Sequence, residues 1–224
     1  MTSNSGSADV LEAAGVKLDI SPEKIGECIE QVGVGFMFAP AHHGAMKHAI
    51  GPRREMAVRT VFNVLGPLTN PAGAPNQVIG VFDGELVEPM ARVLQQLGSH
   101  HVMVVHGEDG MDEITISAST WVAELKDGEV STYTIAPGDF GMQTADLETL
   151  RVESAQQSLD VIRGVFAGAG GPAGDIVCLN AGAAIYVSGL ADTLAAGVDA
   201  ARGAIDSGKA AAVLDALVAK SNGE

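Results

Sequence analysis

Two adjacent carboxylates, Asp112 and Glu113, stand in a short acidic stretch, Gly107–Thr115, that reads Gly-Glu-Asp-Gly-Met-Asp-Glu-Ile-Thr. The apolar run His100–His106 precedes this stretch and predicts a buried strand. A glycine-containing loop at the end of a buried strand is where open α/β sheets bind their ligands. Mg²⁺ prefers oxygen ligands, commonly one or two carboxylates together with water and substrate phosphate. The stretch therefore indicates either a magnesium site or an acidic, solvated turn, since Asp-Gly turns are common.

The composition indicates a protein with a substantial core and a negative surface. The chain has 224 residues, of which 46% are hydrophobic, and its formal net charge is -15. Such a charge argues against non-specific binding of nucleic acid, which relies on clustered Lys and Arg. It leaves an anionic substrate possible, because a bound metal reverses the local field. Cys28 and Cys178 lie far apart in apolar helical patterns, which predicts two buried, free thiols.

The sequence contains no apolar run long enough to span a bilayer and no basic segment followed by an apolar leader. We therefore expect a cytoplasmic protein that has neither a membrane nor a nucleic-acid partner.

Strands and helices alternate in the middle of the chain. Val78–Phe82 predicts a strand, Glu85–Leu97 an amphipathic helix and 100–106 the next strand, an order typical of a right-handed βαβ unit with parallel strands. Thr120–Leu125 and Glu129–Ile135 flank an Asp-Gly pair, which predicts a hairpin. We therefore expect an α/β fold with a mixed central sheet. The helix residues expected to face inward are Leu86, Met90, Val93, Leu94 and Leu97.

Helical patterns dominate both ends of the chain. Ser7 is expected to cap a helix over Ala8–Ala14, and Ser21 the next helix. The apolar face of that second helix comprises Ile25, Cys28, Ile29 and Val32. After it, Gly33–Ala39 predicts a short buried strand or extended segment. Four further helices are expected, over Ser154–Ala167, Pro172–Ser188, Asp192–Ser207 and Gly208–Lys220.

Several other side chains suit the binding of anionic groups. Arg53 lies on a predicted helical stretch, and a guanidinium can bind a carboxylate through two hydrogen bonds; the alternative is a surface charge. The pair His42-His43 fits no common metal-ligand spacing, which favours packing against a substrate or within a loop. The run Ser3 to Ser7 precedes a helix and could hold a phosphate, or it is a plain polar terminus. The histidines of the second strand, His100, His101 and His106, are expected to be structural.

Taken together, several segments resemble the anthranilate phosphoribosyltransferases of tryptophan biosynthesis. In the family's order they are SGSADVLEAAG (5–15), GFMFAPAHHGAMKH (35–48), RREMAVRTVFNVLGPLTNP (53–71), VVHGEDGMDEI (104–114), LNAGAA (179–184) and AIDSGK (204–209). The resemblance implies an enzyme that joins the amine of anthranilate to C1 of the ribose of phosphoribosyl pyrophosphate, with release of diphosphate and the help of Mg²⁺. It also implies a cytoplasmic homodimer.

The resemblance further implies a nucleoside phosphorylase/phosphoribosyltransferase-like architecture, in which a mixed central sheet surrounded by helices stands beside a helical domain. Residues 1–20 would begin the α/β domain, 21–70 would be a remnant of the helical domain, and 71–224 would form the rest of the α/β domain.

Individual residues match the family's functional positions. Asp112 and Glu113 match its Mg²⁺-binding acidic pair, and Arg53 matches the arginine that contacts the anthranilate carboxylate. His43 matches a histidine that lines the anthranilate channel, while Ser3 and Ser7 match serines near the phosphoribosyl pyrophosphate site. No residue is expected to act as a dedicated catalytic acid, base or nucleophile, because departure of diphosphate depends on charge neutralisation and positioning.

The sequence also departs from the family's pattern. The family's leading helices, its diphosphate-binding Gly-Thr-Gly-Gly-Asp loop and its Lys-His-Gly-Asn-Arg segment do not precede Ser3, and Asn4 and Gly44 replace a usual lysine and proline. We therefore expect the isolated chain to bind phosphoribosyl pyrophosphate poorly and to have little transferase activity. A non-catalytic fragment, half of a split enzyme and a pyrimidine nucleoside phosphorylase are alternatives. The pattern around Arg53 and the acidic pair favours the transferase over the phosphorylase.

Overall fold

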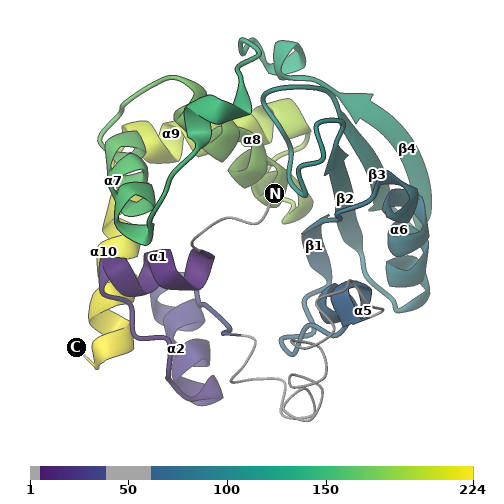
Figure 1. Cartoon of the computed structure of the whole chain (residues 1–224). Helices are drawn as coiled ribbons and strands as arrows, with labels where there is room; N and C mark the ends of the chain where they lie inside the picture. The colour runs from purple at the N-terminus through teal and green to yellow at the C-terminus, as the bar shows by residue number, and fades with distance from the viewer. Residues whose placement is uncertain (1–5, 39–61, 224) are drawn as a thin grey trace, which may run out of the picture. The chain divides into compact units, whose positions relative to one another are not determined.

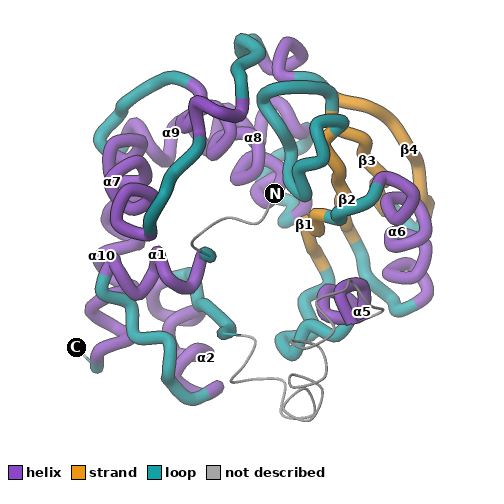
Figure 2. The backbone as a smooth tube through the Cα atoms, viewed as in Figure 1, coloured by secondary structure: helices purple, strands orange, loops and turns teal. Residues whose placement is uncertain are grey.

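The computed structural model describes residues 6–38 and 62–223, and the chain divides into two compact units (Figures 1 and 2). The sheet unit comprises Val64–Arg151 and Gly168–Asp206 and contains all the described strands. The helical unit comprises the described residues of Thr2–Asn63, together with Val152–Ala167 and Ser207–Glu224. No helix in the described part of the chain is long and apolar enough to cross a membrane.

Four strands of the sheet unit lie side by side in chain order (Figure 1): β1 (Asn76–Gly80), β2 (His101–Gly107), β3 (Thr120–Lys126) and β4 (Glu129–Ile135). β1 and β2 are parallel and are joined through α6 (Val87–Gln96), which confirms the predicted βαβ unit. The other two pairings are antiparallel, so the mixed α/β sheet and the β3–β4 hairpin are confirmed as well. β1 covers 76–80 rather than the expected 78–82.

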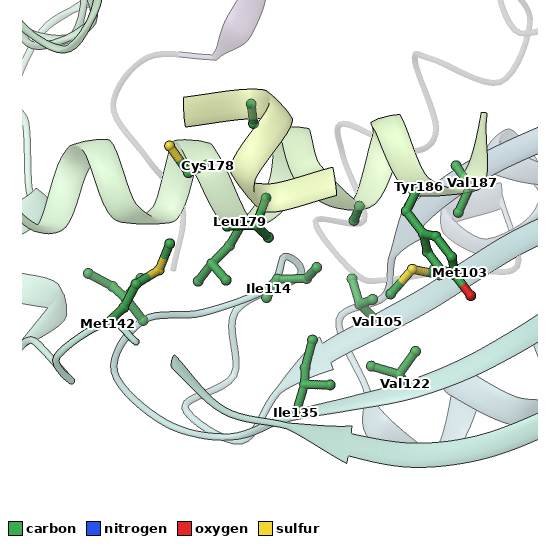
Figure 3. Close-up of a cluster of buried hydrophobic side chains, with 14 residues drawn as sticks. Met103, Val105, Ile114, Val122, Ile135, Met142, Cys178, Leu179, Tyr186 and Val187 are labelled. Carbon is green, nitrogen blue, oxygen red and sulfur yellow. The ribbon is translucent and has the colours of Figure 1, made fainter. Parts of the chain in front are cut away.

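Alternate side chains of the strands enter two different cores. On one face, Met103, Val105 and Val122 join the cluster beneath α8 (Pro172–Val187), as Figure 3 shows. On the other face, Val102 and Val104 pack with α6. Because successive side chains of a strand point to opposite faces, β2 is apolar on both of them and is buried over almost its whole length.

The buried face of α6 is narrower than expected. Met90 and Leu94 are buried as predicted, but Val93 is 38% exposed and Leu97 is 62% exposed, so the prediction was wrong for these two residues. The helix buries Val87, Met90, Ala91 and Leu94, a stripe with helical spacing. Val93 lies off this stripe, and Leu97 follows the last helical residue.

Helices α8 and α9 (Leu194–Asp206) pack closely in the sheet unit. A Cβ atom added to Gly182 would lie 2.6 Å from the backbone of Val198, which only glycine avoids. The remaining short elements of this unit are α5 (Phe62–Leu68) and three 3₁₀ turns, η2 (Gly84–Leu86), η3 (Pro137–Phe140) and η4 (Leu147–Leu150). The first two residues of α5 belong to the helical unit.

The helical unit contains α1 (Ser7–Ala14), α2 (Pro22–Val32), α7 (Ala155–Phe166) and α10 (Lys209–Asn222), which appear as purple coils in Figure 2. Its core includes Val16, Leu18, Cys28 and Leu217. The Ser21 hydroxyl accepts a hydrogen bond of 3.3 Å from the Lys24 N–H and caps α2 as predicted. Cys28 and Cys178 are both buried and free, which confirms the predicted thiols.

Three expectations for the helical unit were wrong. The cap of α1 is Gly6, because the helix begins at Ser7 itself and the Gly6 N–H is bound by the carboxylate of Asp9. Ile29 is 44% exposed, since α2 buries only Ile25 and Cys28. Of the two alternatives for Gly33–Ala39, the buried strand was wrong, because the described residues 33–38 form no strand and none of them is buried; the extended segment remains.

Candidate functional site

The acidic loop, residues 107–119, leaves the carboxyl end of β2 beside the parallel end of β1. The two strand ends are tied together just before the loop. The Val81 N–H donates to the Val105 carbonyl at 3.0 Å, and the buried His106 ring donates from Nδ1 to the Val81 carbonyl at 2.8 Å. His106 is therefore structural, as predicted. The carboxyl ends of parallel strands are where α/β sheets bind ligands.

Two of the four carboxylates in the loop are engaged in holding its shape. Glu108 accepts a hydrogen bond of 3.0 Å from the indole N–H of Trp121. Asp109 accepts from the Met111 N–H at 3.0 Å and also from the hydroxyls of Thr115 and Ser117. These bonds hold the loop in its turn around Gly110, so Glu108 and Asp109 stabilise the shape of the loop.

The hydrogen bonds to Asp109 have an electrostatic consequence. Burial disfavours the charged carboxylate, but the donors from Ser117, Thr115 and Met111 together outweigh it and lower the pKa of Asp109. A carboxylate that accepts several hydrogen bonds is stabilised in its ionised form. Asp109 is therefore negatively charged at neutral pH, with its oxygens directed at the loop.

Asp112 and Glu113 differ from the other two acids, because neither carboxylate has a hydrogen-bond or salt-bridge partner among the described residues. Both residues are exposed. Desolvation by neighbouring atoms, and then the negative charge of Asp112, raise the pKa of Glu113. A cation beside both carboxylates would relieve this repulsion, so the pair has the free oxygens and the charge that a hard divalent cation needs.

The described residues bring together no group of three or more His, Cys, Asp or Glu side chains that could hold a metal by themselves. A pair of carboxylates still fits Mg²⁺, which keeps several waters and commonly takes its remaining ligands from substrate phosphates. The acidic pair therefore suits a metal that arrives with a phosphate ligand better than a permanently bound one.

The peptide that follows the pair is firmly anchored. The Ile114 side chain is 1% exposed and points toward α8 beside Leu179 (Figure 3). The side-chain amide of Asn180, on α8, accepts from the Ile114 N–H at 3.0 Å and donates to the Ile114 carbonyl at 2.9 Å. Asn180 was not among the residues predicted from the sequence. A signal was present, because Asn180 is a large polar residue in an otherwise small and apolar helical run.

The structure does not test the other predicted ligand residues. Ser3, His43 and Arg53 lie outside the described residues. Ser7 is exposed at the start of α1, in the helical unit. The roles of these four residues therefore stay predictions.

A second titratable cluster lies in the sheet unit, away from the loop. Glu124, on β3, is 8% exposed; its carboxylate lies 2.7 Å from Nε2 of His101 and accepts from the Tyr133 hydroxyl at 2.8 Å. Burial opposes ionisation of Glu124, but the bonds from His101, Tyr186 and Tyr133 overcome it and lower its pKa. His101 is thus structural, as predicted, and the cluster crosslinks three strands.

A shallow depression in the sheet unit is lined by residues of η2, α6, β3 and β4, among them Glu88, Trp121 and Tyr133. Neither Asp112 nor Glu113 lines it. We therefore assign it no part in the chemistry of the acidic loop.

A family model described as "Glycosyl transferase family, a/b domain" matches residues 1–211. The chain belongs to this glycosyl transferase family. Among curated relatives, an anthranilate phosphoribosyltransferase from Thioalkalivibrio sulfidiphilus is 68% identical over 218 residues, which are 97% of this chain and 64% of that protein. The chain thus spans slightly less than two thirds of the length of this relative.

Solved structures of anthranilate phosphoribosyltransferases have a similar fold. Anthranilate phosphoribosyltransferase from Thermus thermophilus has a TM-score of 0.91 and 43% identity, over 97% of this chain and 64% of that one. The enzyme from Saccharomyces cerevisiae, solved in complex with PRPP and Mg, has a TM-score of 0.88 over 98% of this chain and 63% of that one. Its identity is 23%, so the yeast likeness concerns the fold alone.

Proposed function

We propose that this chain belongs to an enzyme that transfers the phosphoribosyl group of phosphoribosyl pyrophosphate to anthranilate in tryptophan biosynthesis. The observation that carries the proposal is that the four acids of the loop have two different roles. Two of its acids are used to fold it, and the adjacent pair Asp112-Glu113 is left without a partner among the described residues. The 68% identity to a curated anthranilate phosphoribosyltransferase supports the assignment of substrates.

In the proposed reaction the bond between C1 of the ribose and the diphosphate oxygen breaks, and a bond from C1 to the anthranilate nitrogen forms. The diphosphate leaves with the bonding electron pair, and the amine loses one proton. Positive charge develops on the ribosyl group and negative charge on the diphosphate, so stabilisation of charge and alignment of the two substrates lower the barrier.

The chain's own residues would contribute mainly by binding. Asp112 and Glu113 would hold Mg²⁺, which neutralises charge on the diphosphate when it is bound. Arg53 would orient anthranilate through its carboxylate, and His43 would line the same channel. Ser3 and Ser7 would bind phosphoribosyl pyrophosphate. No described side chain is needed as a general base, because an aromatic amine loses its proton readily once the new bond forms.

The same family supports further proposals. We propose that the whole protein is a cytoplasmic homodimer. The expected domain bounds, 21–70 for a helical domain and 1–20 with 71–224 for the α/β domain, stay a proposal. They differ from the two compact units of the structure, in which α1, α7 and α10 belong to the helical unit.

The test is the disappearance of anthranilate fluorescence when the protein is mixed with phosphoribosyl pyrophosphate and Mg²⁺. It is run on the chain alone and on a chimaera that adds the unmatched part of the Thioalkalivibrio sulfidiphilus relative, since the chain spans 64% of that protein. We expect the chimaera to consume anthranilate, and chelation of Mg²⁺ by EDTA to stop the reaction. A folded chimaera without activity would contradict the proposed function.

A further inference from the structure

Asn180 makes an unusual set of contacts for a residue in the middle of an apolar helix. Its Oδ1 accepts from the Ile114 N–H at 3.0 Å, and its Nδ2 donates to the carbonyls of Ile114 at 2.9 Å and Ile176 at 3.0 Å. One side chain therefore satisfies both backbone polar groups of the residue that directly follows Glu113. The two segments are separated by 66 positions in the sequence.

From these contacts we infer that Asn180 is a positioning residue that fixes the Asp112-Glu113 pair for metal binding. The inference rests on the proposed role of the pair in the transferase. Asn180 touches neither carboxylate, so it acts through the main chain at Ile114.

The anchoring at Ile114 is two-fold. Its side chain is held in the core beneath α8, and its peptide groups are held by the amide. On the other side of the pair, the Met111 carbonyl accepts from the Gly107 N–H at 2.8 Å. The main chain of the two acids is thus fixed at both ends, while the carboxylates themselves have no partner among the described residues.

Holding the backbone matters because the two carboxylates repel each other. Asp112 and Glu113 are adjacent in the chain, so a metal must hold two like charges side by side. If the following peptide were free to move, the two side chains could turn apart, and a metal would have to bring them together again. A pre-organised pair avoids that cost, and residues that orient metal ligands are commonly worth about 10- to 100-fold in metal affinity.

The test measures binding of Mn²⁺, as a spin-active substitute for Mg²⁺, to the full chain in the presence of inorganic pyrophosphate. The signal of free Mn²⁺ in electron paramagnetic resonance gives the dissociation constant. Binding that persists in the Asp112→Asn/Glu113→Gln double variant is subtracted, because a chain with a net charge of -15 attracts cations elsewhere too.

We expect Asn180→Leu to weaken the pair-dependent binding by about tenfold. We also expect faster hydrogen exchange at the Ile114 amide. The matched control is Asn222→Leu in the helical unit, where an Asn amide likewise donates to two carbonyls, Gly15 at 2.9 Å and Val218 at 2.8 Å. The control should leave Mn²⁺ binding within twofold of the wild type.

Should Asn180→Leu not fold, Asn180→Ser serves in its place, since it adds no charge and its shorter side chain lacks the amide that bonds both peptide groups of Ile114. Unchanged or tighter pair-dependent binding in the folded variant, or a wild-type chain without pair-dependent binding, would overturn the inference. An inactive chimaera, together with a chain whose pair-dependent Mn²⁺ binding is weakened by the Asn180 substitution, would count against the proposed function alone.

Discussion

The main-chain oxygen of Asp112 lies so close to Gly80 that a Cβ atom added to this glycine would stand 1.6 Å from it. Gly80 is the last residue of β1, and Asp112 belongs to the loop that follows the parallel strand β2. The absence of a side chain at the end of one strand thus allows the acidic loop of its neighbour to pack over it. This contact places the acidic pair at the carboxyl edge of the two parallel strands.

Replacement of Gly80 by alanine should therefore displace the loop. Because the added methyl group meets backbone rather than a flexible side chain, we expect Gly80→Ala to lower the free energy of unfolding by about 1–3 kcal/mol. Urea denaturation provides the measurement. The control is Gly203→Ala in α9, where an added Cβ meets nothing within 4 Å, and where alanine should stabilise the helix by about 0.5–1 kcal/mol. Equal stability of Gly80→Ala and the wild type would show that the loop is not packed as described.

Asp109 should matter for the shape of the loop rather than for the metal. Asp109→Asn retains the size of the side chain but weakens the bonds from Met111, Thr115 and Ser117. We expect a loss of about 1–3 kcal/mol in the free energy of unfolding, because the buried Thr115 hydroxyl loses its charged partner. Measurement by urea denaturation at pH 7 is direct. A variant as stable as the wild type would contradict the role of Asp109 in stabilising the shape of the loop.

Glu124 should make stability depend on pH. Its pKa is lowered in the folded state, so its contribution is complete above the unfolded pKa, about 4.3, and is lost as the pH falls through the lower folded pKa. Glu124→Gln should cost about 1.5–3 kcal/mol at pH 7, the typical value for hydrogen bonds to a charged group. The difference from the wild type should shrink below about pH 4 in urea titrations.

The control for Glu124 is Glu148→Gln, which removes an exposed carboxylate paired with Arg151. Exposed pairs contribute little, so this variant should differ from the wild type by less than about 0.5 kcal/mol at each pH. A difference between Glu124→Gln and the wild type that stayed constant down to pH 3 would show that ionisation of Glu124 does not stabilise the sheet.

The contribution of Glu113 to the free energy of unfolding should depend on pH in the opposite direction to that of Glu124. Its pKa is raised in the folded state, so stability is highest below the unfolded pKa and is lost as the pH rises through the folded pKa. At pH 7 without metal, Glu113→Gln should therefore be slightly more stable than the wild type, by about 0.5 kcal/mol or less, because solvent screens an exposed charge. With Mg²⁺ and pyrophosphate the order should reverse, since ligand binding stabilises only the intact pair. Thermal unfolding with and without Mg²⁺ measures both effects, and an unchanged order would argue against metal binding at Glu113.

Much of the sheet unit could be predicted from local patterns. The apolar runs around β1 and β2, the amphipathic helix between them and the Asp-Gly turn before β4 specify the mixed sheet. The errors came where tertiary contacts decide the outcome. Val93 and Ile29 fit an apolar helical face in the sequence, but the layer against which each helix packs covers less of that face.

The residue types of the site could be predicted from the sequence, but not which acids hold the loop in shape and which are free to bind a metal. The sequence places four acids in one loop, and their spacing does not show which of them accept hydrogen bonds within the loop. That difference arises from the hydrogen bonds that Trp121 and Ser117, which follow later in the sequence, donate to Glu108 and Asp109. The polar Asn180 stands out in its apolar helical run, but its partner Ile114 lies 66 positions away, so the sequence does not show which segment it holds.

The central claim is that Asp112 and Glu113, and not their neighbours in the loop, hold the metal. Crystals of the full chain soaked with Mn²⁺ and pyrophosphate would test it through the anomalous scattering of manganese. We predict an anomalous peak within coordination distance of both carboxylates, absent in Asp112→Asn/Glu113→Gln and kept in Glu108→Gln, which should retain the Trp121 bond. A peak that persists in the double variant, or that lies only beside Glu108 and Asp109, would contradict the claim.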